Sequence, residues 1–151
     1  MLDNYMELLT REFIATLKIA SERLAKITEE QSVQFPAPGK WSPKQIIGHL
    51  IDSASNNHQR FVRVQLQDGL AMPRYEQEEW VTAQNYQDES WSQLLSFWQS
   101  YNQHLAHVIA NISAEKLSHL VRVGDGETVT LKFLIEDYVA HLRQHLQQIL
   151  D

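Results

Sequence analysis

Apolar side chains recur at steps of three and four residues over four long stretches of this chain. That period predicts amphipathic helices, each with one apolar stripe. The first stretch covers residues 2–27, and its apolar positions include Met6, Leu9, Phe13, Leu17 and Leu24. The third begins at Trp91 and continues through Leu94, Trp98, Tyr101, Leu105, Val108 and Ile112. Alternating steps of three and four are typical of the seam in a helical bundle.

The second stretch has the clearest helix start. Ser42 can cap it, Pro43 occupies the first helical position, and Gln45 completes a capping box. We expect this helix to run to about Leu66.

Similar signals mark the later helices. Ser90 and Gln93 form a second capping box where the third stretch begins. Thr130 can cap the last helix, which should cover residues 131–150. The sequence therefore predicts four helices with defined starts.

The connections between these helices are uneven. Residues 35–39 combine two prolines with a glycine and predict a loop. Residues 68–87 form the longest stretch without a clear period, and Trp80 and Tyr86 favour a loop that lies against the bundle.

Two shorter features precede the last helix. Ser113 can cap a short helix that reaches Leu120. Residues 121–130 carry β-branched side chains on both sides of a Gly-Asp-Gly turn and predict a small hairpin or extended turn. The fold class expected is an all-α four-helix bundle with a longer crossover loop, in one domain over residues 1–151.

The composition excludes several kinds of protein. Hydrophobic residues make up 43% of the chain, and the net charge is −6 without a Lys/Arg cluster, so we expect no nucleic-acid partner. The chain has no cysteine, so a thiol nucleophile would have to come from outside. Residues 1–13 do not resemble a signal peptide, and no apolar window could span a membrane. We expect a cytoplasmic protein without a membrane partner.

Histidines carry the main candidate chemistry. His141 and His145 are four residues apart, so both imidazoles lie on one face of the last helix and can chelate a metal ion. Tyr138 and Ile149 continue the same stripe, which places the pair on the inner face. The alternative is a pair of core or rim histidines that bond to backbone or water.

His49, about two turns into the second helix, is the natural third ligand. Asp52 lies three residues after it, and Asp137 lies four residues before His141. Either carboxylate can accept the second N–H of a ligand imidazole and fix its tautomer. Both are equally well explained as solvated surface charges.

A second histidine pair competes with the first. His104 and His107 are three residues apart, but they flank the apolar seam of the third helix instead of lying on it. We interpret them as edge or surface residues. His58 and His119 have no neighbour at ligand spacing, and we assign them no role.

Three motifs resemble the DinB superfamily of helical bundles. Residues 39–53 read GKWSPKQIIGHLIDS and are followed by NHQRF at residues 57–61, while residues 138–149 read YVAHLRQHLQQI. The shared pattern is Trp-Ser, a histidine seven residues after the serine, and a closing His-x-x-x-His that ends in Gln-Ile. Residues 75–80 also look like the family's crossover loop. The resemblance covers nearly the whole chain.

The resemblance implies a four-helix bundle that is often a homodimer. It also implies one divalent metal ion on His49, His141 and His145, with nickel or zinc foremost and iron or manganese as alternatives. Related proteins include S-transferases that use bacillithiol, mycothiol or glutathione, and others described as metal-dependent hydrolases. Many members have no assigned reaction.

The function expected is the first of the three below, and the other two stay open as alternatives. In the first, the metal activates a low-molecular-weight thiol for attack on a small electrophilic substrate. In the second, the metal activates water and the protein is a hydrolase. In either enzyme Tyr138 can orient or protonate the reacting group, although a packed aromatic explains it as well. In the third, the chain is a dimeric helical binding module without a reaction.

Overall fold

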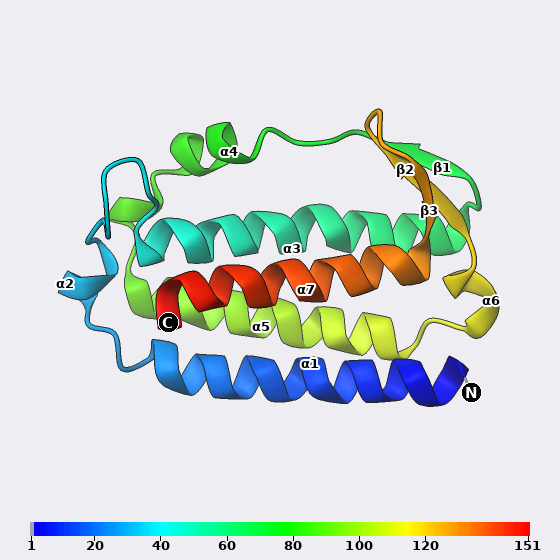
Figure 1. Ribbon diagram of the computed structural model, residues 1–151, viewed down its shortest axis with the longest axis horizontal. Coiled ribbons are helices and arrows are strands. Elements are labelled where there is room, and N and C mark those ends of the chain that lie inside the picture. The colour runs from blue at the N-terminus through cyan, green and yellow to red at the C-terminus, as the bar shows by residue number, and fades with distance from the viewer. Residues whose placement is uncertain (1) are drawn as a thin grey trace.

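Four long helices lie side by side in the computed structural model (Figure 1). They are α1 (Leu2–Leu24), α3 (Pro43–Leu66), α5 (Trp91–Ala110) and α7 (Leu131–Leu150). The model describes residues 2–151, with side chains from residue 4, so Met1 and the first side chains of the predicted stripe lie outside the described part. α3 packs against both α5 and α7, and α1 packs against the same two helices. The predicted four-helix bundle is confirmed.

Large apolar side chains fill the space between these helices. Phe13, Phe61, Trp98, Ile135 and Leu142 are each at most 1% exposed. They come from all four long helices, so every predicted apolar stripe faces one shared core. Within the described residues, no helix is both long enough and apolar enough to cross a membrane.

The capping signals largely predict the helix starts. Ser42 accepts from the backbone N–H of Gln45, whose side chain accepts in return from the N–H of Ser42, as a capping box requires. Thr130 caps α7 through the N–H of Phe133. At α5, Ser90 accepts from the N–H of Gln93, but no reciprocal bond from the Gln93 side chain is present among the described residues. This second box is therefore only half formed.

Three helix ends differ from the prediction. α1 stops at Leu24 instead of residue 27, because Thr28 caps a separate short helix, α2 (Glu29–Ser32), with its own capping box. α5 ends at Ala110, two residues early. The short helix α6 (Ala114–Leu117) ends three residues early, because Leu120 already belongs to a strand.

The connection between α3 and α5, residues 67–90, is the crossover segment, and it contains more structure than a loop. It includes β1 (Leu70–Met72), α4 (Gln77–Gln84) and a 3₁₀ turn, η1 (Tyr86–Asp88). The expected loop over residues 68–87 was therefore wrong in detail, although the segment does lie across α3 as predicted (Figure 1).

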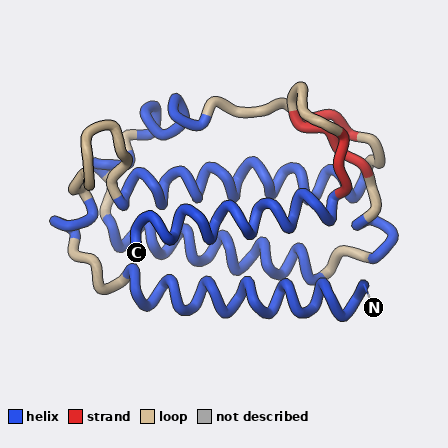
Figure 2. The backbone as a smooth tube through the Cα atoms, in the orientation of Figure 1, coloured by secondary structure: helices blue, strands red, loops and turns tan. Residues whose placement is uncertain are grey.

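A small sheet closes one end of the bundle (Figure 2). β2 (Leu120–Val123) and β3 (Thr128–Thr130) pair antiparallel, which confirms the predicted hairpin. β1 adds to β2 in parallel, with Leu70 opposite Val121. This pairing ties the start of the crossover segment to the hairpin, so the segment is anchored before it passes over α3.

Candidate metal centre

Three histidines from two helices converge on one point. His49 comes from α3, while His141 and His145 lie one turn apart on α7. One ring nitrogen from each lies within 4.8 Å of the others. His141 Nε2 and His145 Nε2 are 3.1 Å apart, and the His49 ring centroid lies 4.6 Å from that of His145. We call these three residues the inner histidine cluster.

The spacing of the cluster fits one divalent ion. Two nitrogens bound at about 2.0–2.1 Å to a tetrahedral ion lie roughly 3.3 Å apart, close to the separation between His141 and His145. His49 is fully buried, and neither of its ring nitrogens has a hydrogen-bond partner. Leaving a buried polar atom without a partner costs about 1–3 kcal/mol, so this position requires an explanation. An ion between the imidazoles would supply the missing partner.

Gln148 selects the nitrogen that His145 presents to the cluster. Its Oε1 lies 3.1 Å from Nδ1 of His145, and an amide oxygen only accepts, so Nδ1 carries the proton. The lone pair of His145 then lies on Nε2, the nitrogen that faces Nε2 of His141 and that could serve as a metal ligand. We did not single out Gln148 from the sequence, although it belongs to the closing Gln-Ile of the quoted motif.

Burial favours the neutral form of His49 and His141. Together with the charges of the neighbouring His145 and His141, it lowers the pKa of His49 from 6.5 to about 3. The pKa of His141 is lowered for the same reasons, with the charge of Asp137 acting in the opposite direction. Neutral imidazoles are the form that binds a metal ion, so protons compete weakly here at neutral pH.

The two candidate carboxylates occupy different positions. Asp137 is exposed and acts on His141 through its charge, without a hydrogen bond to it among the described residues. Asp52 is buried, and its Oδ1 accepts from the hydroxyl of Tyr86 at 2.6 Å and from the amide of Gln84 at 2.8 Å. Asp52 therefore ties the crossover segment to α3, and its Oδ2 has no partner.

Gly48 allows the crossover segment to lie close to the cluster. A Cβ atom at this position would come within 2.1 Å of the Tyr86 ring. Only glycine leaves room for that ring, so the residue next to His49 is fixed by packing. We did not predict this contact, because it joins segments that are far apart in the sequence.

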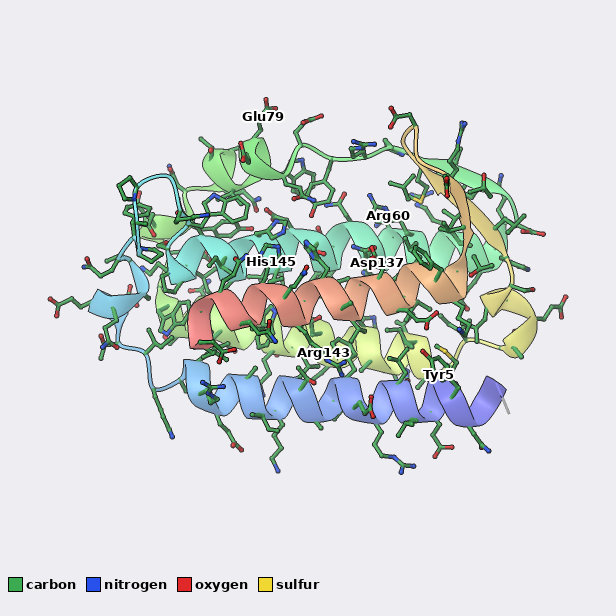
Figure 3. The ribbon with its side chains drawn as sticks, in the orientation of Figure 1. Tyr5, Arg60, Glu79, Asp137, Arg143 and His145 are labelled. Carbon is green, nitrogen blue, oxygen red and sulfur yellow. The ribbon has the colours of Figure 1, made fainter. Side chains whose placement is uncertain are left out.

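A surface groove leads to the cluster. The Trp41 ring lies 5.0 Å from the His49 ring and covers it. Beside it is a groove of about 560 Å³ whose lining includes Lys40, Trp41, Ile46, Glu78, His145 and Gln148. His145 therefore faces a space large enough for a small molecule. Figure 3 shows His145 on α7 beneath the crossover segment.

Tyr138 lies in the core. It is 3% exposed, its hydroxyl donates to Oδ1 of Asn102, and its ring packs edge-on against Phe13 and Phe61. Within the described residues its only hydrogen bond is to Asn102 on α5, not to the inner cluster. The packed-aromatic alternative explains all of these contacts.

The other histidines do not form a comparable site. His104 and His107 are exposed, and their ring centroids are 6.3 Å apart. His58 lies beside His104, at 5.3 Å, and bonds through Nδ1 to the Tyr101 hydroxyl. We call His58, His104 and His107 the outer histidine cluster. His119 donates to the carbonyl of Val64 and holds α6 against α3.

Comparisons with known proteins agree with this fold. Residues 12–149 match the DinB superfamily. A structure of YfiT from Bacillus subtilis, described as a probable metal-dependent hydrolase with an unusual four-helix bundle topology, superposes with a TM-score of 0.80. It is 21% identical and covers 93% of this chain and 83% of its own. A search of curated proteins gave no match.

Proposed function

We propose, from the premise that this chain belongs to the DinB superfamily, that it is a metal-dependent enzyme that activates a small external nucleophile for attack on an electrophilic substrate. One observation carries this proposal: His49 is fully buried, both of its ring nitrogens lack partners, and two further histidines face it. A purely structural core would place apolar side chains there, since unsatisfied imidazole nitrogens are destabilising.

The residues at and around the inner histidine cluster would have different roles. His49, His141 and His145 would hold the ion, and three nitrogen ligands leave coordination positions for exchangeable ligands, as in catalytic sites. When bound, a divalent ion lowers the pKa of a neighbouring water or thiol. Gln148 holds His145 in the required tautomer, and Trp41 keeps bulk water away from His49. The groove beside His145 would admit the substrate.

Water is the nucleophile that the comparisons favour. YfiT is described as a probable metal-dependent hydrolase, and its fold is shared over most of both chains. Hydrolysis needs no cosubstrate other than water. We therefore propose hydrolysis first, and nickel or zinc as the ion.

Transfer of a low-molecular-weight thiol is the second candidate. Its support is the resemblance of the His-containing motifs to a family that includes thiol S-transferases. The chain has no cysteine, so the thiol would arrive as a cosubstrate through the same groove. We also propose that the protein is cytoplasmic and acts on a small molecule, and that it is a homodimer, as the family resemblance implies.

Metal content tests the proposal directly. Protein purified without an affinity tag should contain about one divalent ion per chain, and His49→Ala should contain far less while circular dichroism stays unchanged. An ester and an alkyl halide, each offered with and without glutathione, then separate the two reactions. Metal-dependent ester cleavage without thiol supports the hydrolase, and thiol-dependent loss of the halide supports the transferase. A wild type that binds no metal would favour the non-catalytic module.

A further inference from the structure

Two positively charged side chains of α3, Lys44 and Arg60, are buried, and they differ in their hydrogen-bond and ion-pair partners. Lys44 is 2% exposed, and its ammonium group donates to Glu29 at 2.6 Å and to the carbonyl of Gln87 at 3.2 Å. Arg60 is 8% exposed but forms no ion pair with any described carboxylate. The charge of Lys44 is compensated within the protein, whereas that of Arg60 is not.

The hydrogen bonds of Arg60 are few and long. Nη1 donates to Oδ1 of Asn57 at 3.5 Å, and Nη2 donates to the carbonyl of Pro73 at 3.4 Å. Both exceed the usual 2.7–3.2 Å for N–H···O bonds. A guanidinium has five N–H donors and stays protonated, so most of its bonding capacity is unused. Its Nε has no partner among the described residues and still reaches solvent, so an anion can approach the group from outside.

Arg60 lies on the same face of α3 as His49. His49, Ser53, Asn56 and Arg60 follow at steps of four, three and four residues, and such steps keep side chains on one helix face. The eleven residues from His49 to Arg60 correspond to about 16 Å along the helix axis. The bond to Pro73 shows that this face lies under the crossover segment, and Figure 3 shows Arg60 on that side of α3.

One further donor lies near Arg60. Tyr75, on the crossover segment, is close enough to Arg60 for the guanidinium to act on its pKa. Burial, aided by the charge of Asp52, raises the pKa of Tyr75 to about 12, so its hydroxyl keeps its proton. Asn57 is no such donor, because its amide nitrogen already bonds to the carbonyl and hydroxyl of Ser53. A neutral phenol near a guanidinium suits an oxyanion.

We infer that Arg60 is an anion-binding residue that receives a carboxylate or similar oxyanion at the far end of the α3 face that begins at His49. As a statement about the substrate, this rests on the proposed function; as a statement about anion binding, it does not. The substrate would be an extended molecule with its electrophilic centre at the inner cluster and an oxyanion roughly 10–16 Å away, the length of three or four extended amino-acid residues.

The first experiment uses metal-free protein and simple anions. Succinate and phosphate, at constant ionic strength against chloride, should raise the melting temperature of the wild type. Arg60→Gln should weaken the apparent affinity at least about tenfold, as expected for a lost charge-assisted bond, and Arg60→Lys should keep part of it. Arg63→Gln is the matched control, because Arg63 lies one turn further along α3, is exposed and bonds only to Gln59 among the described residues.

Two results would overturn the inference. One is that neither anion stabilises the wild type more than chloride does. The other is that Arg60→Lys and Arg60→Gln respond to the anions as the wild type does while losing stability, which would make Arg60 a clamp on Pro73. If Arg60→Gln does not fold, Arg60→Lys is the test. A purely structural role of Arg60 in holding Pro73 would leave the anion response of Arg60→Lys equal to that of the wild type.

The second experiment tests whether one ligand can bind the metal ion at the inner cluster and Arg60 at the same time. Metal-loaded protein would be titrated with suberic acid monohydroxamate, whose hydroxamate binds metal ions, and with its methyl ester, which lacks the carboxylate. The acid should bind about tenfold more tightly than the ester to the wild type and to Arg63→Gln, and equally to Arg60→Gln. Equal binding of acid and ester to the wild type would refute the link between Arg60 and the substrate. Failure of both hydroxamates to bind would refute the proposed metal site, while the anion titration still decides the role of Arg60.

Discussion

The inner and outer histidine clusters are similar in sequence and different in space. Each includes two histidines one turn apart on a long helix and a third from α3. In the inner cluster the three side chains converge, and His49 is fully buried without a partner. In the outer cluster His104 and His107 are exposed, and His58 already bonds to Tyr101.

This difference shows what turns histidines into a ligand set. Spacing along one helix brings two imidazoles to one face, but it cannot orient them toward a third. Burial supplies the second requirement, because it removes water as a competing partner and favours the neutral form of His49. The outer cluster has the spacing without the convergence.

The largest expected effect is on metal binding. His141→Ala with His145→Ala should abolish stoichiometric binding of zinc or nickel, because two of three ligand nitrogens disappear. His49→Ala alone should weaken affinity by more than the ~10–100-fold that accompanies loss of a residue that only orients a ligand. His104→Ala with His107→Ala is the control and should leave one ion per chain. Equal loss in both double variants, measured by elemental analysis, would erase the distinction between the clusters.

The next effect concerns the orientation of α5. Trp98 is fully buried, and His107 lies nine residues later, on the opposite side of the helix. Trp98→Ala should lower the free energy of unfolding by about 3–5 kcal/mol, because a large core side chain is lost. Phe97→Ala, at a half-exposed neighbouring position, should change it by about 0.5 kcal/mol or less. If both variants lost a similar free energy of unfolding in urea denaturation, α5 would be rotated about its axis, and His104 and His107 would not be exposed.

A smaller effect is expected from crowding the inner cluster. Gly48→Ala should destabilise the protein by about 1–3 kcal/mol, since its Cβ atom would overlap the Tyr86 ring. The displaced ring should also loosen Asp52 and reduce metal affinity. Tyr86→Leu in the Gly48→Ala background removes the ring and should restore part of the stability. Thermal denaturation with no loss in Gly48→Ala would show that the crossover segment does not press on α3.

The last effect is on the pH dependence of metal-free protein. The pKa of His49 is about 3 in the folded chain and near 6.5 when unfolded, so the unfolded state binds more protons between these values. The stability that His49 contributes is therefore complete above pH 6.5 and declines as the pH falls toward 3. His49→Phe should flatten this slope.

His104→Ala with His107→Ala serves as the comparison for that slope. These two side chains are exposed, so the variant should follow the pH dependence of the wild type. Chemical denaturation at several pH values measures both. A slope that depends on the exposed pair instead of His49 would contradict the burial of the inner cluster.

Local patterns determined most of the fold. The starts of α3 and α7 follow from Ser42, Pro43 and Thr130, because helix caps act within a few residues of the chain. The helical period placed His141 and His145 on one face for the same reason. The hairpin over β2 and β3 likewise depends on a local turn.

The tertiary structure decided the rest. The pairing of β1 with β2, the bond from Tyr86 to Asp52 and the approach of Gln148 to His145 depend on how segments come together or on the rotamers adopted there. That no described carboxylate pairs with Arg60 follows only from the positions of these side chains in the folded protein. Convergence of His49 on α7 is set by the packing of two helices that are separated by the crossover segment and α5, and no short-range pattern encodes that geometry.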